Sequence, residues 1–234
     1  MKKIIILMTA FSLLLCSCND VLEEHPKAVA AETFYNTEEE LDAALLAPLN
    51  KMSQWNGFGM VSWGLPEDLS DMIRGTGSWE HPGEYQILDG TNIGRSDAIW
   101  RQLYMAIRDC NIPLSRLADS KVDNDVKAKY EGQFRFLRGF YYFYLVRCFN
   151  KGVLRTEENM GESDLAISDD KTLYDFIIKD LEFAADNAPD KVSLSGLPTK
   201  YAALAVLSDV YLWQKNYGKA AECAKKVIDS GNYK

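Results

Sequence analysis

Residues that commonly bind metal ions are scarce in this 234-residue chain. It has two histidines and five cysteines, and no two cysteines form a Cys-x-x-Cys pair. The chain therefore has few residues that could form a zinc centre or a site with a histidine base. His25 and His81 stand far apart in segments without helical periodicity, so we interpret both as surface residues. No glycine-rich phosphate loop follows a strand pattern. The sequence predicts no metal site, no cofactor and no catalytic residue.

Basic residues are also in deficit, with 26 Lys and Arg against 34 Asp and Glu and a formal charge of −8. This balance argues against nucleic acid or an anionic lipid surface as a partner. Carboxylate pairs such as Asp68 and Asp71 could serve glycoside hydrolysis, but among so many acidic residues such a pair is expected by chance.

Long apolar runs are missing, and the longest, Ile4–Leu15, is too short to span a bilayer. It follows Lys2 and Lys3 and precedes Cys16-Ser17-Cys18, the order of a secretory signal. Cleavage before Cys16 would leave bulky Leu15 at the last leader position, whereas Leu-Cys-Ser-Cys resembles a lipoprotein box. We expect residues 1–17 to be a signal peptide and Cys18 to be acylated, with an ordinary secretory signal as the alternative. Cys110, Cys148 and Cys223 are then expected to be buried free thiols.

Aromatic residues are abundant in one stretch, Ala128–Asn150, where Phe or Tyr fills nine positions between Tyr130 and Phe149. Apolar residues recur with a 3.6-residue spacing and cover most of a helix circumference. Charged residues interrupt the run too often for a membrane span; they are Glu131, Arg135, Arg138 and Arg147. The stretch therefore predicts a long core helix packed on several sides.

Two further helices and one irregular region precede this stretch. Thr37-Glu38-Glu39-Glu40 forms a capping box that opens a helix running toward Trp55, and a second helix is expected over about Ser96–Leu117. Between them, Asn56–Ser96 loses periodicity and is rich in glycine and tryptophan, as expected of a long functional loop.

The region after the aromatic stretch has the 34-residue periodicity of a tetratricopeptide repeat. Eight residues from Leu204 to Val227 fall at the packing positions of such a repeat when Tyr201 is counted first. A preceding repeat would pair the aromatic helix with a helix around Tyr174–Ala184, with Lys151–Asp170 inserted between them. The fold class predicted is all-α, with repeat-like hairpins at about 128–189 and 198–234.

Several spaced motifs resemble the SusD/RagB family of nutrient-binding lipoproteins. They are Arg-Phe-Leu-Arg-Gly-Phe-Tyr-Tyr-Phe-Tyr-Leu-Val-Arg at 135–147, the Trp100, Tyr104, Ile107 and Asn111 spacing, and Cys-Asn-Asp-Val-Leu-Glu-Glu-His-Pro at 18–26. The resemblance implies an outer-membrane lipoprotein that faces the exterior and has a lipidated tether at 18–36 and a helical domain at 37–234. It also implies glycan binding beside a SusC-like TonB-dependent transporter in oligosaccharide uptake. Members of the family normally continue for about as long again, so we expect a chain that lacks the C-terminal part.

A glycan site needs flat aromatic rings and polar groups around them. The resemblance places it in loops ahead of Trp100, and the candidates there are Arg74, Trp79, Glu84, Tyr85 and Asn92. The alternative is that Trp79 and Tyr85 are buried residues that only hold the loop. At the level of function, the alternatives are a periplasmic or outer-membrane repeat scaffold without sugar binding and a glycoside hydrolase.

Overall fold

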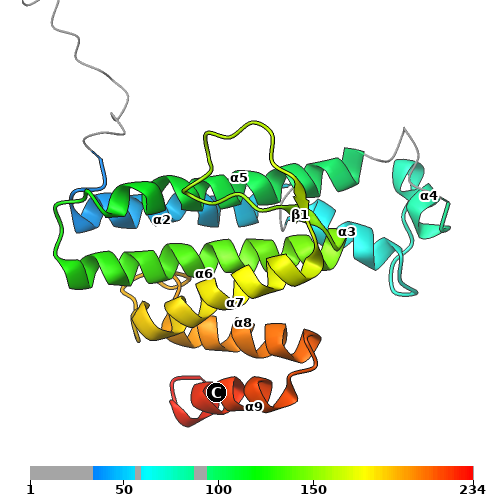
Figure 1. Ribbon diagram of the computed structural model, residues 1–234. Coiled ribbons are helices and arrows are strands. Elements are labelled where there is room, and N and C mark those ends of the chain that lie inside the picture. The colour runs from blue at the N-terminus through cyan, green and yellow to red at the C-terminus, as the bar shows by residue number, and fades with distance from the viewer. Residues whose placement is uncertain (1–33, 56–58, 87–93, 234) are drawn as a thin grey trace, which may run out of the picture. The chain divides into compact units, whose positions relative to one another are not determined.

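The computed structural model describes residues 34–55, 59–86 and 94–233. The predicted signal peptide, Cys18 and Asn92 lie outside these ranges, as does most of the predicted tether. The part described is mostly helical (Figure 1), which confirms the all-α fold class with repeat-like hairpins.

Among the described residues, the helices follow one another along the chain, with one small sheet between α6 and α7. Their bounds are α2 Glu38–Ser53, α3 Met60–Asp68, the 3-10 turn η2 Gly77–Trp79, α4 Glu80–Gly83, α5 Gly94–Leu117, α6 Asn124–Phe149, α7 Asp170–Asn187, α8 Lys200–Trp213 and α9 Tyr217–Asp229. Strands β1 Gly152–Val153 and β2 Ile167–Ser168 pair antiparallel, with Gly152 opposite Ser168. From α5 to α9 each helix packs against the next, and α2 lies against α5 and α6 (Figure 1).

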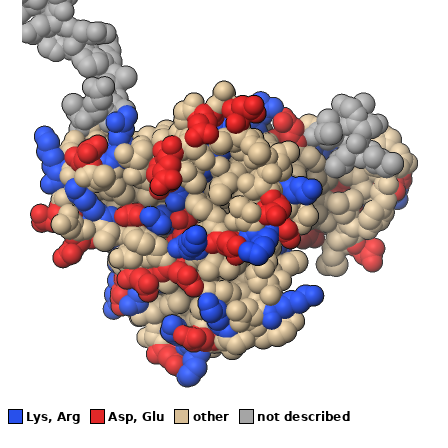
Figure 2. All heavy atoms as spheres, in the orientation of Figure 1, with Lys and Arg blue, Asp and Glu red and all other residues tan. Residues whose placement is uncertain are grey.

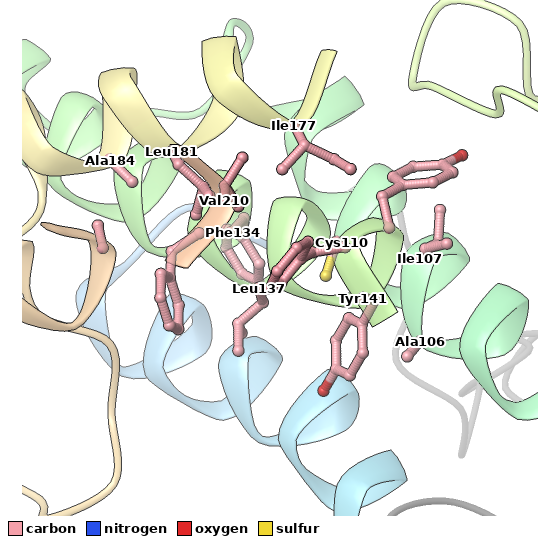
Figure 3. Packing of buried hydrophobic residues seen from close by; sticks show 14 of the residues in the cluster. Ala106, Ile107, Cys110, Phe134, Leu137, Tyr141, Ile177, Leu181, Ala184 and Val210 are labelled. Atoms are coloured by element: carbon pink, nitrogen blue, oxygen red, sulfur yellow. The ribbon is translucent and has the colours of Figure 1, made fainter. Parts of the chain in front are cut away.

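Helix α6 is the centre of this arrangement because apolar side chains leave it in several directions. Tyr130, Phe134, Leu137, Tyr141 and Leu145 are all at most 1% exposed. Figure 3 shows Phe134 and Leu137 among residues of α5, α7 and α8, with Tyr141 directed toward α2. The Tyr141 hydroxyl donates to the carbonyl of Pro48 at 2.6 Å. The predicted aromatic core helix is therefore confirmed.

One buried ion pair joins α6 to its neighbours at Arg138, whose side chain is 2% exposed. Its Nε and Nη2 donate to the two carboxylate oxygens of Asp180 on α7 at 2.6 and 3.0 Å. Its Nη1 donates to Asn111 on α5 at 2.8 Å and also to Glu157, in the segment before α7. Burial acts to lower the pKa of Arg138, but Asp180 and Glu157 raise it above its ordinary value. Three parts of the chain thus share one guanidinium.

The segment between α6 and α7 is held to the helices by two tyrosines, half-buried Tyr104 and buried Tyr142. The Tyr104 hydroxyl donates to the Val153 carbonyl at 2.9 Å and accepts from the Val153 N–H at 2.6 Å. The Tyr142 hydroxyl makes the same pair of bonds with Arg155, both at 2.7 Å. Burial raises the pKa of Tyr104 to about 12. These bonds satisfy backbone groups that a two-stranded sheet leaves unpaired.

Side-chain caps mark the N-terminal ends of several helices. Thr37 caps α2 with the predicted box, in which its hydroxyl accepts from Glu40 N–H and Glu40 accepts from Thr37 N–H. The side chains of Asp169 and Thr199 cap α7 and α8 by accepting from a backbone N–H in the first turn of each helix. Asp123 occupies the corresponding position before α6 but makes no capping bond with its side chain.

Three expectations need correction. The region 56–96 contains helices α3, η2 and α4, which have only nine, three and four residues and are too short for an apolar period to show in the sequence. Cys148 is exposed at the end of α6, although Cys110 and Cys223 are buried and all three thiols are free. Tyr217, at a predicted packing position of the last repeat, is 64% exposed because it begins α9, beyond the reach of α8.

Candidate functional site

A cavity of about 470 Å³ lies where the chain folds back after α3. Its walls come from α3, from the turn after it and from η2, and comprise Met60, Gly64, Glu67, Asp68, Ile73, Arg74, Gly75, Thr76 and Trp79. We call it the loop cavity. It joins an aromatic ring, a guanidinium and two carboxyl groups within one small volume.

Asp68, at the C-terminal end of α3, organises the turn below this cavity. It is 2% exposed, and its Oδ1 accepts from the Gly75 N–H at 2.5 Å. A Cβ on Gly75 would lie 2.3 Å from the Trp79 carbonyl oxygen, and a Cβ on Gly83 would lie 2.8 Å from Asp68 Oδ1. Glycine at both positions therefore lets the backbone close around one carboxylate.

Trp79 is half-buried and forms the aromatic wall of the loop cavity. The guanidinium of Arg95, in the first turn of α5, lies 4.1 Å from the centre of its ring. Arg95 also donates to the carbonyl and hydroxyl oxygens of Ser78 at 2.8 and 3.0 Å. The ring is thus fixed in position by a cation–π contact and by the turn that carries it.

Arg74 contributes the positive group of the cavity, and its charge is shared with two glutamates. Its Nη2 lies 3.6 Å from both Glu80 and Glu84. Arg74 is 78% exposed in its side chain, so these pairs add little to stability. They do leave Arg74 with little uncompensated charge.

Tyr85 has an exposed ring on a strained backbone. It is 73% exposed, its φ of 55° lies in the left-handed region, and its hydroxyl donates to the Leu69 carbonyl at 2.5 Å. A bulky residue rarely adopts this conformation without a compensating contact. The alternative that Tyr85 is buried is therefore wrong, although its hydroxyl does join the turn to Leu69.

The structure therefore brings some of the predicted site residues together and leaves others apart. Arg74 and Trp79 line the loop cavity, whereas Glu84 contacts Arg74 from outside the lining and Tyr85 faces solvent. Asn92 lies outside the described residues. In the sequence, Asp68 stood out only as one of a chance pair with Asp71 and was not placed in this cavity; the glycines at 75 and 83 are a sequence signal for the turn, but they do not indicate which side chain they surround.

Two other hollows are larger; one of them also combines aromatic rings with Arg147 and Glu67, but neither is lined by a buried carboxyl group such as Asp68. One, of about 640 Å³, lies between α3, α5, α6 and the end of α8 and includes Tyr144, Phe149 and Trp213. The other, of about 600 Å³, lies along α7, α8 and α9 and mixes Lys219 and Lys226 with Glu182 and Glu222. On the face shown in Figure 2, Lys and Arg alternate with Asp and Glu without a broad area of one sign.

Neither a metal cluster nor a membrane span is found in the part of the chain that the structure describes. No group of three or more His, Cys, Asp or Glu side chains there could hold a metal ion. No helix within residues 34–55, 59–86 and 94–233 is both long and apolar enough to cross a membrane.

Comparison with known proteins gives a consistent family. A family model described as "Starch-binding associating with outer membrane" matches residues 20–212. The SusD-like protein P2 of Formosa agariphila is 30% identical over 98% of this chain and 47% of its own length. A SusD-like protein of Bacteroides ovatus is 26% identical and is covered over 39% of its length, so the chain spans less than half of either curated relative.

Solved structures agree with the fold. A SusD homologue from Bacteroides thetaiotaomicron has a TM-score of 0.75 at 24% identity, over 87% of this chain and 43% of that one. A laminarin-binding SusD-like protein has a TM-score of 0.69 at 27% identity, over 82% of this chain and 44% of that one. With the family model covering most of the sequence, this chain belongs to the SusD-like family, which is described as starch-binding and associated with the outer membrane.

Proposed function

We propose that the chain binds a glycan in the loop cavity and does not catalyse its breakdown. The observation that carries the proposal is the meeting of Trp79, Arg74 and the buried Asp68 around about 470 Å³. Sugars present flat C–H faces that pack on aromatic rings and hydroxyl rims that hydrogen-bond with charged groups. Family membership and the laminarin-binding relative support the same ligand class.

The first test replaces the aromatic wall. Trp79→Ala should weaken binding to laminarin or starch oligosaccharides about 10- to 100-fold, because the lost ring contact is worth roughly 1.5–3 kcal/mol. Titration calorimetry on the intact chain measures the change. Trp213→Ala is the matched control, since Trp213 is 52% exposed on α8 and lies outside the loop cavity.

Unchanged glycan affinity of Trp79→Ala would argue instead for the scaffold alternative, in which the helices bind protein alone. The groove along α7, α8 and α9 supports that alternative, because it is lined by exposed charged groups of both signs, whose weak surface ion pairs a peptide could replace with its own. A hydrolase would release reducing ends from the bound glycan. We expect no release, and a sugar-release assay on a glycan that binds would detect it.

The proposal extends to the place where binding happens. Removal of residues 1–17 and acylation of Cys18 would hold the protein on the outer membrane through a tether of residues 18–36, facing the exterior beside a SusC-like TonB-dependent transporter. A domain of residues 37–234 would then present the loop cavity to incoming oligosaccharides. Support comes from the sequence motifs at 18–26 and from the outer-membrane association of the family.

The proposed acylation of Cys18 can be measured directly. Labelling of cells with an alkyne fatty acid should mark the wild-type chain and Cys16→Ala but leave Cys18→Ala unmarked. Equal labelling of Cys18→Ala and wild type would contradict the assignment. Purification of the labelled protein with a TonB-dependent transporter would test the partnership separately.

A further inference from the structure

One carboxylate oxygen at the loop cavity has no partner. Oδ2 of Asp68 is buried and makes no hydrogen bond, and among the described residues no other buried carboxylate oxygen is left in this state. A buried acceptor without a donor costs about 1–3 kcal/mol, and more when it is charged. Such a group in a folded protein calls for an explanation, and a functional contact at this oxygen is one.

The position of Asp68 fits this role. Oδ1 is held by the Gly75 N–H, so the carboxyl group is fixed in orientation and only Oδ2 remains to accept. Asp68 belongs to the wall of the loop cavity together with Trp79, the ring on which a sugar face would rest. Oδ2 has almost no accessible surface, so a ligand hydroxyl reaches it only when the surrounding wall moves; Ile73 and Thr76 on the same wall are exposed, and exposed side chains change rotamer within nanoseconds.

Charge around the cavity has one prevailing sign. Glu67 and Asp68 line it, and Glu80 and Glu84 compensate Arg74 from either side at 3.6 Å. Arg95 is the other nearby cation, and it is held over the Trp79 ring and against Ser78. Four carboxylates therefore face two guanidinium groups, and an anionic ligand would be repelled.

From these observations we infer that Asp68 determines specificity in the loop cavity by accepting a hydroxyl of a neutral sugar and by excluding uronic or sulfated sugars. This rests on the proposed glycan binding and deepens it from a general sugar site to one for uncharged hydroxyl-bearing units. A hydroxyl supplies the donor that Oδ2 lacks, whereas a ligand carboxylate or sulfate offers only acceptors.

The test compares two isosteric variants that each remove one negative charge, one from the cavity wall and one outside it. Asp68→Asn keeps an oxygen for the Gly75 N–H but puts an NH2 group where the unpaired oxygen was. It should lose about 10- to 100-fold in affinity for laminarin oligosaccharides, as expected for a hydrogen bond to a charged group. Asp71→Asn, at an exposed position that does not line the cavity, should change that affinity less than about threefold. Melting temperatures of both variants verify the fold.

The wild-type chain gives a second measurement that needs no substitution. Oligouronates of matched length should bind at least about tenfold more weakly than the neutral oligosaccharide. Equal or tighter oligouronate binding overturns the inference, as does Asp68→Asn with wild-type affinity for laminarin while Trp79→Ala has lost it. That last pattern leaves the proposed function standing. Absence of neutral-glycan binding by the wild type would instead defeat the proposed function, and this inference with it.

Discussion

At the scale of single residues, buried tyrosine hydroxyl groups stabilise the fold by bonding to backbone groups of other elements. Tyr141 is an example, since its ring fills the core between α5 and α6 while its hydroxyl satisfies the carbonyl of Pro48. Proline inside α2 removes a backbone donor from the helix. Helix α2 nevertheless continues to Ser53, and the Tyr141 hydroxyl joins it to α6 next to this proline.

Truncation at Tyr141 separates these two contributions. Tyr141→Ala should lower the free energy of unfolding by about 3–5 kcal/mol, and Tyr141→Phe by only about 1–2 kcal/mol, because the second variant removes the hydroxyl alone. Urea unfolding followed by circular dichroism measures both. Tyr217→Ala, at a position that is 64% exposed, is the control and should stay within about 0.5 kcal/mol. A melting curve unchanged in Tyr141→Ala would place this residue outside the core.

At the scale of elements, α6 meets α7 through a buried charge pair as well as through apolar contacts. Gly132 and Gly139 let the two helices approach, and a Cβ on Gly132 would lie 2.8 Å from the Ala188 nitrogen. Arg138 and Asp180 occupy the same interface. Such a pair gives less net stability than its geometry suggests, because both groups lose their hydration.

A double-mutant cycle tests this reading of the interface. Asp180→Ala should cost about 3–5 kcal/mol, since it leaves the guanidinium of Arg138 with a buried and incompletely compensated charge. Arg138→Met combined with Asp180→Leu should recover a large part of that loss. Equilibrium unfolding in urea gives the coupling energy. If the double variant were less stable than Asp180→Ala, the pair would be a net source of stability.

At the scale of the whole molecule, buried tyrosines set the response to alkaline pH. Burial raises the pKa of Tyr104 to about 12 and raises that of six further tyrosines, which are Tyr35, Tyr130, Tyr141, Tyr142, Tyr174 and Tyr211. An unfolded tyrosine ionises near pH 10. Between about pH 10 and pH 12 the folded state therefore binds more protons than the unfolded state.

Stability should be fully present below about pH 10 and should fall as pH rises above it. Each tyrosine with a raised pKa contributes up to about 1.4 kcal/mol per pH unit. Urea unfolding at about pH 8, 10 and 11 measures the slope. Tyr104→Phe is less stable at neutral pH but should show a shallower decline. A decline equally steep in Tyr104→Phe would exclude Tyr104 from the effect.

The helices could be predicted from the sequence, but the polar contacts between elements could not, and the reasons are physical. Periodicity reports which face of a helix is apolar, so the core positions of α6 and the α8–α9 hairpin could be predicted. Arg138 looked like an interruption of an apolar run, because its partner Asp180 is 42 residues away and no local pattern links them. At the candidate site, Trp79 and Arg74 could be anticipated from residue type. Asp68 could not, because its burial depends on a turn that closes only in three dimensions.

The excursion between α6 and α7 is fixed to the helices at its base, and its exposed tip bonds back to that base, where Arg155 donates to the Glu162 carbonyl. Tyr104, Tyr142 and Arg138 hold residues 153–157, whereas residues 160–164 are exposed and a Cβ on Gly161 would meet nothing within 4 Å (Figure 1). Closing a longer flexible loop costs only about 0.6 kcal/mol for each doubling of its length. A fluorescent or affinity tag inserted at Gly161 would therefore leave the helices undisturbed, so that ligand titrations could be followed on the intact chain.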